Sequence, residues 1–145
     1  MSKIHLNIGS NTGDRHALIE RAIALLSHSL PCAATVYRSD YIESEPWGFD
    51  SPNPFLNIGL MIITDAVMDP HAMLDITQQV EQQVGQGAPH RNPDGTYRDR
   101  PIDIDIIDID SITLNTPRLI LPHPRAHLRS FVTIPMHELE EKYKP

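Results

Sequence analysis

The sequence has 145 residues, of which 40% are hydrophobic and 21% are charged, and its formal net charge is −7. This length fits one compact domain over residues 1–145, and the composition is that of a folded globular protein rather than a disordered chain. The acidic balance argues against duplex nucleic acid as a partner, because such binding relies on a basic surface that neutralises many phosphates. A small anion stays compatible with it, since arginines gather between Arg91 and Arg129.

Cysteine usage and hydropathy indicate the cellular compartment of the protein. Cys32 is the only cysteine, so neither an intramolecular disulfide nor a cysteine-based zinc site can form within one chain. The chain has no apolar run of about 18 residues, and residues 1–8 alternate polar and apolar side chains, unlike a signal peptide. We therefore expect a cytoplasmic protein that neither spans a membrane nor is exported.

The first half of the chain predicts a strand, a helix and a second strand. Residues 3–8 alternate with the two-residue period of a strand that buries one face. Turn and N-cap residues over 9–14 precede apolar positions at helical spacing, which predict a helix over about 15–27. β-Branched and aromatic residues over 34–42 predict a second strand, and a long loop is expected over 43–54.

The second half predicts two further strands and two helices. A continuous apolar run over 55–64 predicts a third strand in the centre of the sheet. A helix is expected over about 69–84, and a second long loop over 86–98 follows it. Residues 102–109 predict the fourth strand, and the mixed segment 125–142 predicts a last helix.

The order of the main elements favours one fold class. Strand, helix, strand, strand, helix, strand matches the ferredoxin-like split βαβ arrangement, in which both helices lie on one face of an antiparallel sheet. We therefore predict an α+β fold, a ferredoxin-like βαββαβ sandwich whose long loops contribute to the active site.

Asp103 and Asp105 are the strongest candidates for metal binding. In a strand, side chains two residues apart lie on the same face, about 6.5 to 7 Å apart along the backbone. A hard cation relieves their repulsion, and magnesium is usually bound by one or two carboxylates together with substrate phosphates. The alternation slips at Ile106-Ile107, so Asp108 and Asp110 are expected on the opposite face unless a bulge intervenes. The alternative interpretation of all four aspartates is the solvated face of an edge strand.

Arginines and a histidine are candidates for phosphate binding. Arg98 and Arg100 stand just before the aspartate pair, and arginine suits phosphate through its planar fork of donors. His123 lies between two prolines that restrict the backbone, although a surface turn histidine is the alternative. Residues 9–13 open a helix after a strand, but they lack the lysine of a P-loop and the third glycine of a dinucleotide fingerprint. An N-capping turn is therefore favoured there over a phosphate cradle.

Aromatic residues gather around the first long loop. Trp47, Phe49 and Phe55, with Asn57 just beyond, place aromatic faces and an amide where a planar heterocycle can stack. For Phe55 taken alone, packing in the core is an equally good interpretation.

Several motifs occur together, and their order resembles one known family. The most specific is Arg-x-x-Asp-x-Asp at residues 100–105, ahead of Leu-Pro-His-Pro-Arg at 121–125. The others are Ile8-Gly9-Ser10-Asn11, Tyr37-Arg38-Ser39, Glu45-Pro46-Trp47-Gly48, Asn53-Pro54-Phe55-Leu56-Asn57, Gln78-Gln79-Val80-Glu81 and Arg129-Ser130-Phe131. Over nearly the whole chain the sequence resembles 6-hydroxymethyl-7,8-dihydropterin pyrophosphokinase, the folate-pathway family that moves diphosphate from ATP to a pterin alcohol.

The resemblance implies a metal, nucleotide and pterin site. Asp103 and Asp105 are implied to hold two Mg²⁺ ions between the ATP phosphates and, with Arg100, to be the catalytic residues. The implied ATP-binding residues are Gln78, Arg100, Ile106, Arg118, His123 and Arg129, to which position alone adds Arg98. The implied pterin slot has Phe55 and Phe131 on either side of the ring and Ser44, Trp47 and Asn57 around it.

The chain departs from the family pattern in the second long loop. Tyr97-Arg98-Asp99 stands where many members carry Trp-Gly-Pro, and Gln86 stands where an arginine often follows the helix-ending glycine. Phosphate contacts from this loop are therefore expected from Arg91 or Arg98, on position alone.

The reaction that the resemblance implies is in-line attack by the pterin hydroxymethyl oxygen on the β-phosphorus of ATP, with AMP leaving. The long loops are expected to close over ATP and exclude water. Two alternatives stay open: a metal-dependent phosphohydrolase, because the same groups suit water as nucleophile, and a non-catalytic ferredoxin-like binding module. The expected partners are ATP and a pterin, with no nucleic acid and no membrane, and a monomer is expected.

Overall fold

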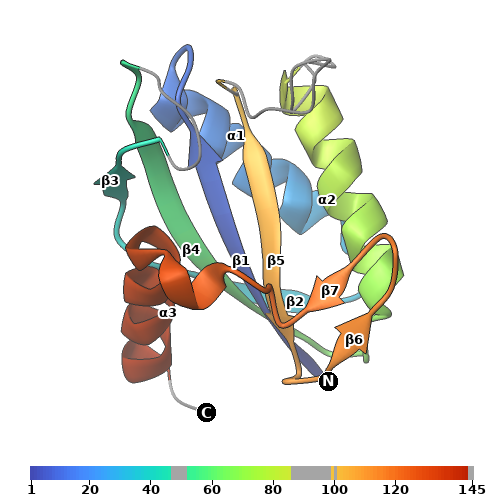
Figure 1. Ribbon diagram of the computed structural model, residues 1–145. Coiled ribbons are helices and arrows are strands. Elements are labelled where there is room, and N and C mark those ends of the chain that lie inside the picture. Colours follow the sequence, from blue (N-terminus) through green and yellow to red (C-terminus); the bar gives the residue numbers. More distant parts are fainter. Residues whose placement is uncertain (47–51, 86–98, 100, 144–145) are drawn as a thin grey trace.

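The computed structural model describes residues 1–46, 52–85, 99 and 101–143. Its elements (Figure 1) are β1 (Ser2–Ser10), α1 (Arg15–Ser29), β2 (Ala34–Arg38), β3 (Ile42–Ser44), β4 (Phe55–Thr64), α2 (Pro70–Gly85), β5 (Asp103–Ile109), β6 (Leu114–Asn115), β7 (Ile120–Leu121), the 3₁₀ helix η1 (Ala126–Leu128) and α3 (Ser130–Lys142). None of the helices within these ranges has the length and apolar character needed to cross a bilayer.

The main sheet has the predicted ferredoxin-like topology. Its strands lie in the order β2-β4-β1-β5, each pair is antiparallel, and β3 also pairs with β4. β4 and β1 are therefore central, and β5 lies at one edge, as Figure 1 shows. The predicted α+β class and the central place of the third strand are confirmed.

One face of the sheet forms the main apolar core. Alternate residues of β1, such as Ile4, Leu6 and Ile8, point to this face and are almost fully buried. α1 and α2 cover it with helical stripes that include Ile19 and Val80. Burying each such side chain stabilises the fold by roughly 1.5–3 kcal/mol. Both predicted helices thus lie on one side of the sheet, as expected.

The other face is covered in part by α3, which corrects the expectation that β1 buries only one face. His5 and Asn7 point to this second face and are only 2% and 4% exposed. α3 comes very near the sheet at Gly59, where a Cβ atom would lie 2.7 Å from Pro135 Cβ. A residue without a side chain is therefore required at this crossing.

The predicted second strand over 34–42 is interrupted in the structure. Ser39 donates its backbone N–H to the Gly59 carbonyl at 3.0 Å, and its Oγ accepts the Gly59 N–H at 2.8 Å. A side-chain oxygen thus replaces a backbone acceptor, which separates β2 from β3. The β6–β7 hairpin was not predicted, because strands of two residues are too short to show a period.

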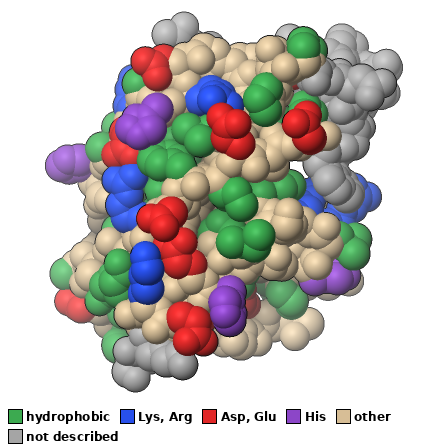
Figure 2. All heavy atoms as spheres, turned by 90° about the vertical axis from the view of Figure 1, so that its left-hand side faces the viewer, with side chains coloured by type: hydrophobic (Ala, Val, Ile, Leu, Met, Phe, Trp, Pro, Cys, Tyr) green, Lys and Arg blue, Asp and Glu red, His purple; other side chains and the backbone are tan. Residues whose placement is uncertain are grey.

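The surface mixes charges of both signs. On the face that Figure 2 shows, acidic and basic side chains of the described residues are interspersed with hydrophobic ones. Among the described residues of this face, no continuous basic surface of the kind on which duplex nucleic acid binding relies is visible.

Candidate active site

A bulge in β5 decides which of its residues face α3. The register between β1 and β5 shifts by one residue between Ile106 and Asp108, which leaves Ile107 as the extra residue. The Ile107 side chain packs on the α3 side with Ala126 and Val132. The consecutive isoleucines that break the sequence alternation are thus the residues that bend the strand.

The strand register defines three rows of side chains on the α3 face, because directly paired residues of antiparallel strands point to the same side. Across β4, β1 and β5, the first row is Asn57, Gly9 and Asp103, the second is Gly59, Asn7 and Asp105, and the third is Met61, His5 and Asp108. Asp103 and Asp105 share a face, as predicted. A bulge does intervene, and it keeps Asp108 on that face as well, which is the exception stated with the expectation that Asp108 points away. Asp110 lies beyond the strand and accepts the Lys3 N–H at 2.7 Å.

α3 holds the second and third rows. Asn7 Nδ2 donates to the Phe131 carbonyl at 2.8 Å, and His5 Nε2 lies 2.8 Å from Glu140 Oε1. Figure 1 shows α3 and η1 in front of the lower half of the sheet, whereas the first row lies toward its upper end. The carboxylate of Asp103 is half-buried there.

The bulge also positions His123, whose backbone N–H donates to the Ile107 carbonyl at 2.8 Å. The Arg125 N–H donates to His123 Nδ1 at 3.2 Å, so a neutral ring carries its proton on Nε2. Burial and then the charge of Arg129 lower the pKa of His123 below 6.5, although Asp103 acts in the opposite direction. At neutral pH the ring is therefore neutral, with an Nε2–H available to donate to an anion.

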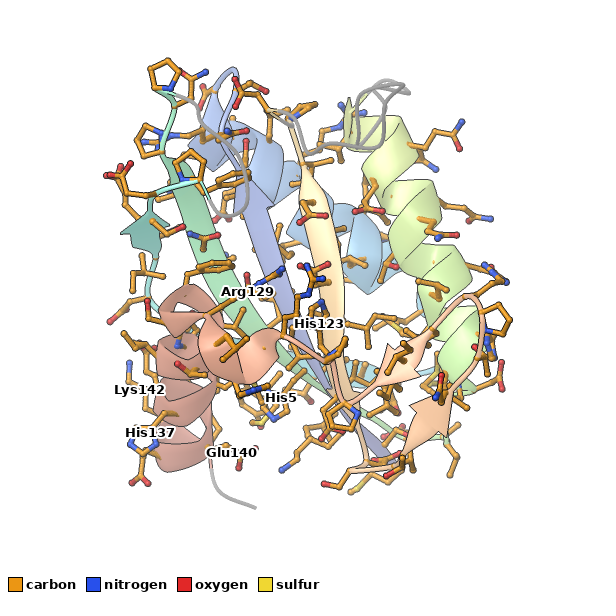
Figure 3. The ribbon with its side chains drawn as sticks, viewed as in Figure 1. His5, His123, Arg129, His137, Glu140 and Lys142 are labelled. Carbon is orange, nitrogen blue, oxygen red and sulfur yellow. The ribbon has the colours of Figure 1, made fainter. Side chains whose placement is uncertain are left out.

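Arg129 brings a cation to the same place. Its side chain is 12% exposed, and its Nη1 lies 3.9 Å from Asp105 Oδ2. The guanidinium carbon is 5.8 Å from the centre of the Phe131 ring, within the range of a cation–π contact. Figure 3 shows Arg129 and His123 side by side in front of β5. The structure thus gathers both aspartates with the predicted histidine, arginine and phenylalanine.

The start of β4 holds two of the predicted ring-binding residues, Phe55 and Asn57, and Ser44 pairs with Phe55 from β3. Asn57 Nδ2 donates to Ser44 Oγ at 2.8 Å and to the Ile42 carbonyl at 3.2 Å, so β3 fixes this amide. A Cβ atom on Gly9 would lie 2.9 Å from Asn57 Oδ1 and 3.3 Å from Phe55 Cδ1. Gly9 therefore makes room for an aromatic ring and an amide beside Asp103.

Gln78 and Arg118 form a separate pair beside the β6–β7 hairpin. Arg118 Nη2 donates to Asp75 Oδ1 at 2.7 Å and to Gln78 Oε1 at 3.3 Å, and both acceptors lie on α2. The Ile106 side chain is 4% exposed and lies in the main core, so only its backbone can reach a ligand. The other predicted residues, Trp47, Arg98 and Arg100, and also Phe49 and Arg91, lie outside the described residues.

Glu81 was not predicted to serve the site. This carboxylate is 7% exposed, and its Oε2 accepts the Ile104 N–H at 2.8 Å. It thereby fixes the edge of β5 between the two aspartates. The signal available in the sequence was a glutamate on the apolar stripe of α2, beside Val80 and Val84. The predicted N-capping turn is confirmed, because Asp14 Oδ1 accepts the Ala17 N–H at 3.1 Å.

Comparison with known proteins identifies a family. Residues 5–141 match the model of the family described as 7,8-dihydro-6-hydroxymethylpterin-pyrophosphokinase (HPPK). The chain belongs to the HPPK family. Proteins named 2-amino-4-hydroxy-6-hydroxymethyldihydropteridine pyrophosphokinase from Porphyromonas gingivalis and Bacillus subtilis are 38% and 33% identical to it. These alignments cover 96% and 93% of this chain, and 91% and 76% of the relatives.

Solved structures share the HPPK fold. A crystal structure of Plasmodium falciparum HPPK-DHPS has a TM-score of 0.70 and 14% identity, and the match covers 99% of this chain. A second HPPK-DHPS structure has a TM-score of 0.68 and 15% identity. The chain spans 42% and 40% of those two longer chains, so this likeness concerns the fold of the HPPK part alone.

Proposed function

We propose that this HPPK-family protein transfers diphosphate from ATP to 6-hydroxymethyl-7,8-dihydropterin, giving the pterin diphosphate and AMP in folate biosynthesis. The observation that carries the proposal is the first row, in which Asn57, Gly9 and Asp103 lie side by side. An amide and an aromatic ring suited to a flat heterocycle thus adjoin carboxylates suited to a metal. The diphosphate must pass from the metal-binding carboxylates to the ring-binding residues, so these two parts of the site have to lie next to each other.

The carboxylates of Asp103 and Asp105 fit Mg²⁺, since both are half-buried, share a face and offer only oxygen ligands. Within the described ranges, no cluster of three or more histidine, cysteine or acidic side chains is placed to hold a metal by itself. ATP phosphates would therefore complete the coordination of two ions, which neutralise the charge that develops on the transferred group.

The phosphate side of the proposed site is cationic. His123 Nε2–H and the Arg129 guanidinium are proposed to donate to phosphate oxygens, because both stand beside the aspartates. Arg100 and Arg98 are proposed to add donors from the preceding segment. For the remainder of the nucleotide, Gln78 and Arg118 together with the Ile106 backbone are proposed to line the site.

The pterin side is proposed to hold the ring between Phe55 and Phe131, with Ser44, Trp47 and Asn57 around it. In the structure, β3 engages the Asn57 amide nitrogen, and Asn57 Oδ1 faces Gly9. Such an acceptor suits the N–H groups of a pterin edge. The ring would then present its hydroxymethyl oxygen toward the aspartates.

The proposed reaction is a single in-line displacement. The hydroxymethyl oxygen bonds to the β-phosphorus while the bond from that phosphorus to the α-phosphate oxygen breaks, and AMP leaves. The alcohol proton is lost to solvent. The protein contributes mainly by holding both reactants in line and neutralising charge.

A direct test is to incubate the protein with Mg²⁺ and ATP, with and without the pterin alcohol, and to quantify the nucleotides. AMP that forms only with the pterin supports the proposal. Pterin-independent cleavage would indicate the phosphohydrolase, and no cleavage would indicate the non-catalytic module.

We also propose a cytoplasmic monomer built as one domain, because ATP is a cytoplasmic substrate and the proposed residues all come from one chain. Fractionation of cells and the mass of the protein in solution test these two points.

A further inference from the structure

Three polar side chains meet just beyond the paired ends of the strands. Asn11 follows β1, Asn53 precedes β4 and Asp99 precedes β5, and we call them the Asp99 cluster. Asn11 Nδ2 donates to Asp99 Oδ1 at 2.7 Å, and Asn53 Nδ2 donates to Asp99 Oδ2 at 2.8 Å. Asn11 Nδ2 also donates to the Asn53 carbonyl at 3.2 Å. A carboxylate only accepts, so it fixes the orientation of both amides.

The Asp99 cluster is a long-range contact. Asp99 is 88 residues from Asn11 and 46 residues from Asn53 in the chain. Asn11 is 3% exposed while Asn53 and Asp99 are half-buried, so its hydrogen bonds to them are partly shielded from water. Hydrogen bonds to an ionised acceptor are stronger than those between neutral groups. The cluster therefore ties three loops together at one point.

The Asp99 cluster adjoins the first row. The strand following Asn53 begins at Phe55, and the strand following Asp99 begins at Asp103. Gly9, which pairs with both Asn57 and Asp103, stands just ahead of Asn11. In Figure 1 these chain segments meet at the upper end of the sheet.

We propose that Asp99 is a positioning residue for the diphosphate transfer, an inference that rests on the proposed function. Through Asn53 it fixes the chain leading to Phe55 and Asn57, on the pterin side. Because Asp99 directly precedes Arg100, holding Asp99 in place also fixes where the chain enters the phosphate side. In-line transfer requires the reacting atoms to be aligned about 3–3.5 Å apart, and a shift of about 1 Å lowers the rate about 100-fold. Asp99 sets the spacing of the two halves without touching either substrate.

The test begins with Asp99→Ala, which removes both acceptors. We expect kcat at saturating ATP and pterin to fall about 10- to 100-fold, because alignment is lost while each half of the site persists. The Tm should fall by only a few degrees, because Asn11 keeps its hydrogen bond to the Asn53 carbonyl, and kcat is measured well below it. Asp69→Ala is the matched control, because Asp69 Oδ2 accepts the Ala72 N–H at 2.9 Å at the start of α2, and α2 follows the end of β4 opposite the one near Asn57. This control should keep the wild-type kcat.

A reciprocal exchange separates positioning from a general loss of charge. Asp99→Asn places three amides together and Asn53→Asp places two carboxylates beside Asn11, whereas the double variant restores a donor and an acceptor in reverse between positions 53 and 99. We expect the double variant to recover most of the kcat lost in either single variant. Wild-type kcat in Asp99→Ala, or no recovery in the double variant, would overturn the proposal.

A readout that needs no turnover keeps the two proposals distinguishable. The side-chain amide NMR signals of Asn11 and Asn53 should shift in Asp99→Ala, and unchanged signals would contradict the contact itself. If the wild-type protein forms no AMP with the pterin, the proposed function falls and the positioning role falls with it. If it forms AMP and Asp99→Ala forms it equally fast, only the positioning role falls.

Discussion

The two faces of the central sheet differ in what their side chains do. On the face covered by α1 and α2, residues such as Ile62 and Ile104 join one apolar core. On the opposite face, the first two rows hold amides, glycines and carboxylates. Because alternate residues of a strand face opposite sides, β5 gives Ile104 to the core and its neighbours Asp103 and Asp105 to the polar face. Stability and chemistry are thus separated by one residue along the same strand.

The two faces of the sheet should therefore respond differently to substitution. Substitutions on the apolar face should lower the free energy of unfolding and leave turnover intact at temperatures where the protein stays folded. Substitutions of Asp103 and Asp105 on the polar face should do the reverse. Asp103→Asn, Asp105→Asn and Ile62→Ala test this separation, and Gly59→Ala tests the part of the polar face that α3 closes.

The largest effect is expected from Asp103→Asn and Asp105→Asn. Each should lower kcat about 10³-fold, because a metal site contributes several kcal/mol of charge stabilisation and each 1.36 kcal/mol is tenfold in rate. The Tm of Asp103→Asn should stay level or rise, since one carboxylate of a repelling pair is removed, whereas Asp105→Asn also weakens the ion pair with Arg129 and should lower the Tm slightly. Asp110→Asn, just beyond the same strand, is the control for loss of charge alone. Wild-type kcat in both variants would remove the aspartate pair from the metal site.

Ile62→Ala should have the largest effect on stability. Ile62 is fully buried on the apolar face of β4, so the variant loses burial and leaves a cavity. The free energy of unfolding, measured by urea titration, should fall by about 2–5 kcal/mol. The kcat measured well below the Tm should match the wild-type value, and a large loss of kcat would break the proposed separation.

Gly59→Ala tests the closed part of the polar face. The new Cβ would lie 2.7 Å from Pro135 Cβ and 3.3 Å from Leu139 Cδ1, so α3 must shift. We expect a loss of about 1–3 kcal/mol in stability from this overpacking. Gly85→Ala is the matched control, since its Cβ would meet its neighbours at 3.5 Å or more. Equal stability of the two variants would show that α3 does not rest on Gly59.

The smallest effect is expected from the Glu20–Arg38 ion pair, which lies at the exposed edge of the face that α1 covers. Hydrogen bonds from Arg38 and then Tyr41 lower the pKa of Glu20 to about 2. Because this pKa lies below the unfolded value of 4.5, the pair stabilises the protein above pH 4.5, and this contribution is lost as the pH falls toward 2. Glu20 and Arg38 are 37% and 40% exposed, so the contribution is below about 1 kcal/mol.

Arg38→Met measures this contribution by urea unfolding at about pH 7 and about pH 3. The difference in stability from the wild type should be present at the higher pH and smaller at the lower one. An equal difference at both would assign the loss to packing of the arginine stem rather than to its charge.

The sequence predicted those features of the fold that depend on a local period. Alternation placed Asp103 and Asp105 on one side of a strand, and apolar spacing located both helices of the core. Alternation could not show that His5 and Asn7 would also be buried, because this depends on where α3 packs. The face of β1 that was expected to be exposed is therefore the one on which the proposed site lies.

Features that depend on a single contact could not be predicted. The consecutive isoleucines indicated a slip, but only the register showed that a bulge at Ile107 keeps Asp108 with the other aspartates. Ser39 breaks its strand through one hydroxyl, which no period reveals. Asp99 was noted as a departure from the family pattern, and its contacts with two distant asparagines emerge only in the folded chain.

The central claim is that diphosphate moves as one unit from ATP to a pterin alcohol. Phosphorus-31 NMR of the protein with Mg²⁺, ATP and 6-hydroxymethyl-7,8-dihydropterin tests it most directly. The account predicts that AMP and a pterin diphosphate appear in equal amounts, and that neither appears when the pterin is omitted. Formation of ADP or inorganic phosphate in place of these products would contradict it.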